Sequence, residues 1–572
     1  MNSYAKPKTI DLFILSFFVV LMTFQPFYSH GEINLFEVGL YLPGINALLE
    51  GMVPFRDFFH LRGAFEIYGP AWLMSIFGPR IEVMYAYFYV GNIVCLLMAI
   101  LIGRELYKSR LIFYLMVPVF VARTFPRVVF PFWGGFRYAL GLLALYGALR
   151  FFKRENPGWM FLAGVAAAAG LLTSVEIGVC ALAGIISALI FSFVFRIQRR
   201  PVVIKGILFF GLGVLSVGIP YAVYLFKTNS FWPTLEAVWA VIHKEEILDT
   251  ALVCALPANP WDVIRVMLNP THDNFRHITP TYFYIIFLCY FIHRFRRERM
   301  DSRDLAAMAV AVYGVILYHT AFRNIWAAQF EMALQPQKIL LFYLLEQAYL
   351  FLRERQAYFT SIVRSYFTVD GKKWKLEGRI LLIRFLILGL VMSSLGYSFA
   401  RFNQRFYTFR YIKGWFLKKD FVSALKPWHD KPSRPLTIDR AGGIIVPIEQ
   451  ADELEQVGEF LGKNTAPNEA VLMYPEYGTY SFLFDRPFVG RFPICTFSWF
   501  NENWHREFVA ELKNDPPRFV VMPKKNPTNW SLVYLTPEKN RRKYDEVTGF
   551  IKENYFLKQE TPRSYIYQRN NS

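Results

Sequence analysis

Residues 36–78 read FEVGLYLPGINALLEGMVPFRDFFHLRGAFEIYGPAWLMSIFG, and this stretch lies between two long apolar runs. It places carboxylates at Glu37, Asp57 and Glu66 and cations at Arg56 and Arg62 among Tyr, Phe, Pro and Gly. The stretch is too polar and too interrupted to be a simple membrane-spanning helix. Because charges next to lipid are costly, these five residues mark a candidate functional segment.

The composition is that of a polytopic membrane protein. Of the 572 residues, 54% are apolar and only 19% are charged, whereas a soluble domain has about a quarter of its residues charged. The apolar residues gather in runs of roughly 15–22, the length that crosses the hydrocarbon layer as a helix. The formal net charge of +19 comes from Lys and Arg that cluster at the ends of these runs, a pattern typical of cytoplasmic loops. A nucleic-acid partner is therefore not expected.

We predict about eleven transmembrane helices from the apolar runs. Basic clusters alternate with them in a way that puts the N-terminus in the cytoplasm and the segment after Phe27 outside. The predicted spans are Leu12–Phe27, Val83–Gly103, Leu111–Val121, Tyr138–Leu149, Trp159–Thr173, Val179–Phe195, Ile207–Leu225, Pro280–Ile292, Leu305–Tyr318, Ile339–Leu352 and Ile380–Ser398.

The composition changes to that of a soluble domain after Pro427. Helical patterns at Glu449–Leu461 and Tyr544–Asn554 alternate with short apolar strand patterns at Ala470–Glu476 and Arg518–Pro523. We therefore expect a transmembrane domain over residues 1–427, with its first external loop at 29–81, and an extracytoplasmic α/β domain over 428–572. A basic, aromatic segment at Arg401–Lys419 precedes it, either as an amphipathic helix on the outer leaflet or as a lip that receives a charged substrate.

Arginines accompany Pro and Gly in the stretch VPVFVARTFPRVVFPFWGGFRY, residues 117–138. Pro118 and the prolines and glycines that follow are expected to interrupt the helices there, which is tolerated where the backbone lines a protein cavity. Arg123, Arg127 and Arg137 have the planar guanidinium groups that suit the phosphate of a polyprenyl carrier. The alternative is that some of them reach lipid headgroups from an interfacial position.

Two further outer-surface residues are candidates for substrate binding. Glu176 follows the fifth predicted span and Arg323 follows the ninth. For Glu176 a solvated or helix-capping position is an equally good interpretation. The five cysteines, at 95, 180, 254, 289 and 495, include no CxxC pair and indicate neither a zinc site nor a disulfide framework.

The first external loop resembles that of bacterial GT-C glycosyltransferases of the ArnT and protein-mannosyltransferase-like group. The resemblance rests on Glu37 before Gly-Leu-Tyr, on the GMVPFRDFF turn of residues 51–59, and on Arg62-Gly63 before a helix that ends at Gly78. It implies a GT-C-like helical bundle, a donor sugar on polyprenyl phosphate, and transfer with inversion of the anomeric centre. It also implies Glu37 as the catalytic base or acceptor-orienting group, Asp57 as the acidic residue of the turn, and Arg323 as a late-loop arginine.

This chain departs from the family pattern at several positions. Phe36-Glu37 stands where many relatives have adjacent Asp-Glu, and Gly63-Ala64 stands where they have Gly-Pro. Ile325 and Ala328 replace an acidic residue and a histidine after Arg323. The missing second carboxylate weakens the case for a divalent metal, so no cofactor is assigned. The missing late residues imply an altered substrate or an inactive relative.

The chemistry of sugar transfer needs a base for the incoming hydroxyl and positive charge for the leaving phosphate. A carboxylate at Glu37 and arginines at 62, 123, 127 and 137 supply both kinds of group. Alternatives for Glu37 and Asp57 are structural roles, at a helix N-terminus and in a Pro-x-x-Asp turn. A site facing outward cannot use cytosolic nucleotide sugars, which favours a lipid-carried donor and a lipid, glycan or protein acceptor. The family implies a bacterial cytoplasmic membrane.

Two rival functions remain at this point. A lipid-linked sugar flippase or transporter also has intramembrane charges and broken helices, although no inverted repeat is detectable here. An O-antigen ligase or polymerase depends mainly on external arginines rather than on a first-loop carboxylate. Replacement of Glu37 by Gln separates the glycosyltransferase from that ligase.

Overall fold

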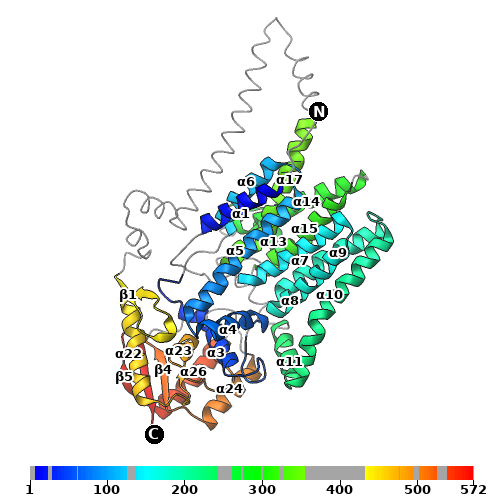
Figure 1. The fold of residues 1–572 in the computed structure, drawn as a ribbon. Coiled ribbons are helices and arrows are strands. Elements are labelled where there is room, and N and C mark those ends of the chain that lie inside the picture. Colours follow the sequence, from blue (N-terminus) through cyan, green and yellow to red (C-terminus); the bar gives the residue numbers. More distant parts are fainter. Residues whose placement is uncertain are drawn as a thin grey trace.

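The computed structural model describes most of the chain. The described residues are 7–23, 29–60, 62–124, 135–242, 260–271, 275–297, 300–321, 328–354, 432–475, 477–493, 501–524 and 537–570. Figure 1 shows two layers, with long helices in one and a sheet with its own helices in the other.

Long helices that run side by side form the first layer (Figure 1). They are α1 (Thr9–Thr23), α5 (Ile81–Leu106), α6 (Arg110–Thr124), α7 (Gly135–Arg154), α8 (Gly158–Thr173), α9 (Val175–Val194), α10 (Arg200–Lys227), α14 (Phe275–Arg296), α15 (Ser302–Thr320) and α17 (Gln335–Glu354). Shorter helices α11 (Phe231–Ile242), α13 (Pro260–Met267) and α16 (Ala328–Ala333) lie between them in sequence.

Three of these helices are long and apolar enough to cross a membrane, judged by length and composition among the described residues: α5, α9 and α10. Each predicted span up to Leu352 overlaps a helix of this layer. The last predicted span, Ile380–Ser398, and the segment Arg401–Lys419 lie outside the described residues. The number of eleven spans therefore stays a prediction.

One expectation about helix breaks is wrong. Pro118 was expected to interrupt a helix, but α6 continues through it from Arg110 to Thr124. Phe113, Met116 and Phe120 of the same helix are buried in the large apolar core that the helices share. Packing by neighbouring helices compensates for the backbone hydrogen bond that a proline removes. Of the other expected breaks, Pro126, Pro131 and Gly134 lie outside the described residues, and Gly135 is the first residue of α7.

The second layer holds the β-strands β1 (Ser433–Pro435), β2 (Ile445–Pro447), β3 (Leu472–Met473), β4 (Phe519–Pro523), β5 (Tyr555–Glu560) and β6 (Ser564–Arg569). Strands β3, β4, β6 and β5 form one sheet in this order, with β3 parallel to β4 and the other pairs antiparallel. The helices here are α22 (Ile448–Asn464), α23 (Gly478–Leu483), α24 (Glu502–Asn514) and α26 (Pro537–Asn554), with a 3-10 turn at Asp439–Ala441.

The predicted elements of this C-terminal part are found where the sequence placed them. The helical patterns fall on α22 and α26, and the two strand patterns fall on β3 and β4. The sequence analysis missed the hairpin of β5 and β6, which completes the sheet. The domain boundary near residue 427 and the placement of this part outside the cell stay predictions.

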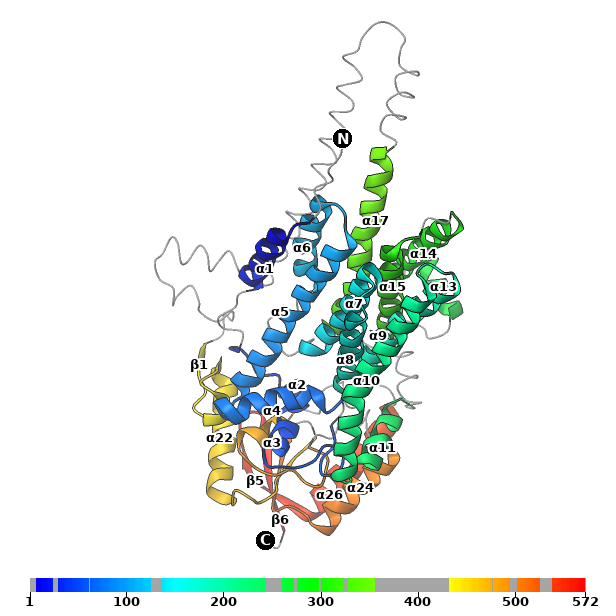
Figure 2. The same cartoon turned by 45° about the vertical axis from the view of Figure 1, so that its right-hand side comes forward.

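The first loop, residues 29–81, lies between the two layers (Figures 1 and 2). It folds into α2 (Leu35–Gly39), α3 (Leu42–Leu49) and α4 (Phe65–Phe77). Apolar residues of α2, α3 and α4 share one buried core with residues of α22, α23 and β4. The loop is thus partly buried between the two layers rather than being only a surface connection.

Hydrogen bonds across a long sequence distance fix the start of this loop. The side-chain amide of Gln450 accepts from the backbone N–H of Ile33 at 2.8 Å and donates to the Ile33 carbonyl at 2.9 Å. The Thr479 hydroxyl donates to the Leu35 carbonyl at 2.5 Å. Because such bonds satisfy buried backbone groups, they orient α2 on the C-terminal layer.

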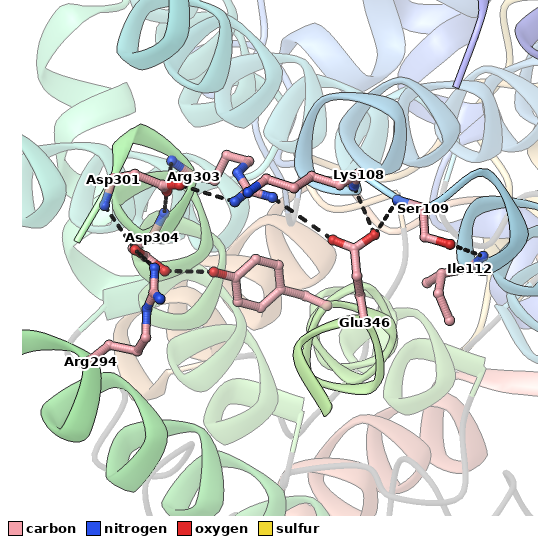
Figure 3. Close-up of polar contacts among 9 residues, drawn as sticks. Lys108, Ser109, Ile112, Arg294, Asp301, Arg303, Asp304 and Glu346 are labelled. Atoms are coloured by element: carbon pink, nitrogen blue, oxygen red, sulfur yellow. Dashed lines mark hydrogen bonds and ion pairs between the residues drawn. The ribbon is translucent and has the colours of Figure 1, made fainter. Parts of the chain in front are cut away.

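A buried polar cluster lies where the ends of four helices meet, and Figure 3 shows its contacts. The Glu346 carboxylate on α17 accepts from the backbone N–H groups of Lys108 and Ser109, at 2.7 and 2.5 Å. Its other oxygen is 3.9 Å from an Nη atom of Arg303, at the start of α15. Because Glu346 is fully buried, these contacts hold α17 against α15 and the turn between α5 and α6.

A second carboxylate extends this cluster. Asp304 accepts from the Tyr343 hydroxyl at 2.6 Å and pairs with Arg294 at 2.8 Å. Asp301 caps α15 by accepting from the backbone N–H of Asp304, and the Asp304 side chain accepts from the Asp301 N–H in return. This capping box stabilises the helix end from which Arg303 reaches Glu346.

Candidate active site

Glu37 lies in the first turn of the short helix α2. The Asn34 side chain caps this helix by accepting from the Glu37 N–H at 3.1 Å. The Glu37 side chain is half-buried. Burial raises the pKa of Glu37 to about 7, although the charges of Arg62 and Arg137 oppose that shift. A carboxylate that ionises near neutral pH has the property required of a general base.

Arg62 and Glu66 form an ion pair next to Glu37. An Nη atom of Arg62 is 3.1 Å from a carboxylate oxygen of Glu66, four residues later at the start of α4. The same Nη atom donates to the hydroxyl of Tyr41, whose ring also faces the guanidinium at 5.5 Å. Burial alone would lower the pKa of Arg62, but the charge of Glu66 raises it above its ordinary value. Arg62 therefore stays a cation.

Arg137 reaches the same carboxylate from the helical layer. One of its Nη atoms is 4.0 Å from the Glu66 oxygen that Arg62 contacts, and its side chain is only 4% exposed. A guanidinium group of the first loop and one of the helical layer thus share one carboxylate. The structure brings together three of the predicted site residues, Glu37, Arg62 and Arg137, whose charges are close enough to act on each other.

Several buried polar atoms of this cluster have no hydrogen-bond partner in the described part of the chain. They are Nε and Nη2 of Arg137, Oε2 of Glu66 and Nε2 of His60. The His60 ring packs near Tyr41, with centroids 6.3 Å apart, and burial lowers its pKa to about 3, so this imidazole is neutral. Because buried polar groups are nearly always paired, unpaired donors and acceptors concentrated in one cluster are suited to binding a polar ligand.

The start of α7 positions Arg137. The backbone N–H of Gly135 donates to the Asn92 side chain on α5 at 2.9 Å. A Cβ atom at Gly91 would lie 2.6 Å from the Phe136 nitrogen, so only glycine lets α5 approach this helix end so closely. Gly91 and Asn92 of α5 therefore fix the position of the start of α7, from which Arg137 reaches Glu66.

The segment that carries His60 and Arg62 is held on both sides. The Phe59 N–H donates to the Arg491 carbonyl at 2.7 Å, and the Phe59 ring packs on Trp504 with centroids 4.6 Å apart. On the other side, a Cβ atom at Gly63 would lie 1.9 Å from the Leu172 carbonyl oxygen at the end of α8. Glycine at position 63 thus lets the loop touch the helical layer.

The Asp57 carboxylate makes its contacts within the turn that ends at this residue. Its carboxylate accepts from the Val53 N–H at 2.8 Å and pairs with Arg56 at 2.7 Å. The hydrogen bond from Arg56 lowers the pKa of Asp57 below its ordinary value. The carboxylate also lines a small cavity of about 70 Å³ between α3 and residues 481–490. These contacts fit the structural alternative for Asp57 better than a catalytic role.

The remaining predicted residues have different positions. Glu176, in the first turn of α9, accepts from the Thr320 hydroxyl at the end of α15 at 2.5 Å. Arg123 lies in the last turn of α6, but its side chain lies outside the described part of the structure, as do Arg127 and Arg323. Their roles stay predictions.

Sequence reasoning did not select Tyr41, His60 or Glu66 as site residues. The spacing of four between Arg62 and Glu66, at the start of a helix, is a signal that could have identified Glu66. Tyr41 belongs to the Gly-Leu-Tyr pattern of the first loop, but that pattern assigns it no role in the site. No local pattern marks His60.

The described residues contain no cluster of three His, Cys, Asp or Glu side chains that could hold a metal ion. Glu66 faces two guanidinium groups, and positive neighbours disfavour a bound cation. The donor set at this site therefore fits an anion better than a divalent metal.

The fold is similar to those of solved membrane enzymes. ArnT from Cupriavidus metallidurans in the apo state aligns over 98% of this chain and 97% of that chain, with a TM-score of 0.52 and 10% identity. The structure titled ArnT bound to undecaprenyl phosphate aligns over 98% of each chain, with a TM-score of 0.49 and 10% identity.

A third solved structure is that of the archaeal oligosaccharyltransferase AglB from Archaeoglobus fulgidus in complex with an inhibitory peptide and a dolichol-phosphate. The alignment covers 98% of this chain and 74% of the AglB chain. Its TM-score is 0.46 and its identity 10%. No protein-family model matches the chain, and no curated protein matches it by sequence. At this low identity, the likeness to apo ArnT shows a shared fold.

Proposed function

We propose that this chain, whose fold is that of the GT-C membrane glycosyltransferases, transfers a sugar from a polyprenyl-phosphate carrier to an acceptor. The transfer takes place at the outer face of the bacterial cytoplasmic membrane and inverts the anomeric centre. The observation that carries this proposal is a half-buried Glu37 with a pKa of about 7, beside an arginine whose buried N–H groups are unpaired.

Glu37 acts as the general base in this proposal. Its carboxylate takes the proton from an acceptor hydroxyl, whose oxygen forms a bond to the anomeric carbon. The bond between that carbon and the phosphate oxygen breaks, and the phosphate leaves with the electron pair. A positioned base contributes a factor of ~10²–10⁴ to such a rate.

The arginines stabilise the leaving phosphate. Nε and Nη2 of Arg137 are buried donors without a partner among the described residues, and Arg62 stays a cation beside them. Fixed donors act where negative charge develops, without reorganising during the reaction. Arg123, Arg127 and Arg323 are proposed to extend this phosphate contact, and Glu176 to contact substrate from the outer end of α9.

The roles of the two first-loop carboxylates differ in this proposal. Glu66 pairs with Arg62 and orients it, whereas Asp57 holds the turn of residues 53–57 through the Val53 N–H. Asp57 takes a proton less readily than Glu37, because the hydrogen bond from Arg56 lowers the pKa of Asp57, whereas burial raises the pKa of Glu37.

The test is a transfer assay on the purified protein in nanodiscs. Radiolabelled polyprenyl-phosphate sugars serve as donors and a membrane extract as the acceptor, with wild type, Glu37→Gln and Glu32→Gln compared. Glu32 is an exposed carboxylate of the same loop that pairs with Arg563 at 3.2 Å, so it is the matched control.

We expect label transfer by wild type and Glu32→Gln, and a loss in Glu37→Gln although that variant melts as a folded protein. If the wild type consumes none of the donors, that result would contradict a glycosyltransferase and favour the flippase or transporter alternative. Transfer that survives in Glu37→Gln would contradict a first-loop base and favour the ligase-like alternative.

A further inference from the structure

Helix α11 carries an apolar face whose large side chains are exposed. Trp232 is 72% exposed, Leu235 47% and Trp239 61%. Their spacing of three and four residues puts them on one side of the helix. Large apolar side chains gathered on one face usually mark a contact surface.

The opposite side of α11 is buried against the candidate site's own support. Thr234 and Ala237 are buried, and Ala237 belongs to the same apolar cluster as Phe55, Phe59 and Trp504. Phe59 directly precedes His60 in the first loop. One face of α11 therefore packs on the first loop and the C-terminal layer, and the large apolar side chains of its other face are exposed.

The helix before it indicates what covers the exposed face. In α10, a window with a mean hydropathy of 2.3 is only 22% buried within the protein, and many large apolar side chains of this helix are exposed. They include Leu208, Leu212, Leu215, Ile219 and Phe226. A surface of this kind is suited to lipid tails, and α11 continues it after a turn at Thr228–Ser230.

Length places α11 in the headgroup region. The 28 residues of α10 extend about 42 Å as a helix, whereas the hydrocarbon layer is about 30 Å thick. The last turns of α10, with Tyr221 and Tyr224, and α11 beside them (Figure 2) thus lie beyond the hydrocarbon. Tyr and Trp are enriched at this level of the bilayer.

We propose that Trp232, Leu235 and Trp239 insert into the headgroup layer of the bilayer that α10 crosses, and so anchor the first loop to the membrane surface. The partner is the lipid interface rather than another protein, because the face continues a lipid-suited surface and consists of two Trp and one Leu. This proposed membrane contact does not depend on the proposed sugar transfer.

The test places an environment-sensitive fluorescent amino acid at position 235 of the full-length protein in phosphatidylcholine nanodiscs. The quenchers are lipids with a doxyl group close to the headgroup, lipids with a doxyl group deep in the acyl chain and, separately, aqueous iodide. Leu557 on β5, which is 45% exposed, is the matched control, and Leu215 on α10 is the reference for lipid contact.

We expect shallow doxyl lipids to quench the label at 235 but not at 557, and iodide to do the reverse. The double variant Trp232→Ser, Trp239→Ser is expected to lose quenching at 235 by shallow doxyl lipids, while deep doxyl lipids still quench the label at 215. A label at 235 that behaves like the one at 557 would overturn the proposal. Quenching at 235 only by lipids with a deep doxyl group would contradict the headgroup position.

Discussion

The protonation state of Glu37 links the stability of the first loop to pH. Burial raises its pKa to about 7 in the folded chain, against about 4.3 for an exposed glutamate. The folded chain therefore holds the proton more tightly than the unfolded chain does. The resulting stabilisation is fully present below about pH 4.3 and is lost as the pH rises through about 7.

Glu37→Gln is expected to remove this pH dependence. Between about pH 5 and pH 8 the apparent Tm of the wild type should fall more than that of the variant, which carries no charge to desolvate. At about pH 8 the variant should be the more stable protein. Melting curves in detergent at the two pH values measure the difference, with Glu459→Gln on the exposed face of α22 as the control. Parallel curves for wild type and Glu37→Gln would refute the raised pKa.

Arg137 should not be replaceable by lysine. Lysine keeps the positive charge but lacks the planar fork that presents Nε and Nη2 together. We expect Arg137→Lys to lower kcat/KM for sugar transfer by roughly 10²-fold or more, as for the loss of one fixed donor. The matched control is Arg150→Lys on the same helix, whose guanidinium is paired with Glu105 at 2.5 Å. Equal activity of the two variants would show that Arg137 does not contact the reacting phosphate.

For single residues, the sequence predicts part of the charged groups of the site but not all of the residues that form it. Glu37, Arg62 and Arg137 could be selected because charges are unusual next to apolar runs. Glu66 was seen as a charge in the same stretch, yet its contact with Arg137 at 4.0 Å joins segments about 70 residues apart in sequence. The neutral state of His60 arises from burial, which no local pattern encodes.

Among the elements, the contact between the first loop and α8 is the most sensitive to side-chain volume. A Cβ atom at position 63 would lie 1.9 Å from the Leu172 carbonyl oxygen, so Gly63→Ala must push the loop away from the helix. We expect a loss of about 1–3 kcal/mol in stability and reduced transfer, because Arg62 moves with the loop.

Gly549→Ala in α26 is the control for this change. A Cβ atom there meets no atom within 4 Å, so alanine should be neutral or stabilise the helix by up to about 1 kcal/mol. Melting temperature and transfer rate are measured for both variants. A Gly63→Ala protein with wild-type melting and wild-type transfer would show that the loop does not rest on α8 as described.

The cluster in Figure 3 should be structural. Glu346→Gln keeps one acceptor for the two backbone N–H groups of Lys108 and Ser109 but removes the charge that faces Arg303. Losing one partner of a buried network costs about 1–3 kcal/mol, so we expect a lower apparent Tm. Glu459→Gln breaks only an exposed pair with Lys463 and should not change the Tm measurably. Equal melting of the two variants would contradict a structural role for Glu346.

The success of prediction at the element scale depends on how local each signal is. The α22 and α26 patterns and the strands β3 and β4 are visible because their apolar periodicity is local. The β5–β6 hairpin was missed, since β5 is largely exposed and gives no apolar run. Pro118 was misjudged because neighbouring helices, and not the local sequence, decide whether a proline interrupts α6.

In the whole molecule, the first loop is partly buried between the two layers. Apolar patterns predicted the long helices and the C-terminal elements α22, α26, β3 and β4. The shared core of the loop with α22 and α23 was not predictable, because it depends on pairs such as Ile33 and Gln450, which are 417 residues apart. The candidate site lies where this loop meets the helical layer, so both layers fix its geometry.

The pH dependence of sugar transfer tests the role of Glu37 most directly. With a polyprenyl-phosphate sugar as the donor, kcat/KM of the wild type should rise with pH and reach half of its maximum near pH 7, where Glu37 loses its proton. Glu37→Gln should be slower by at least ~10²-fold and lack this inflection. A Glu37→Gln protein that transfers sugar at the wild-type rate, with the same pH profile, would contradict Glu37 as the base.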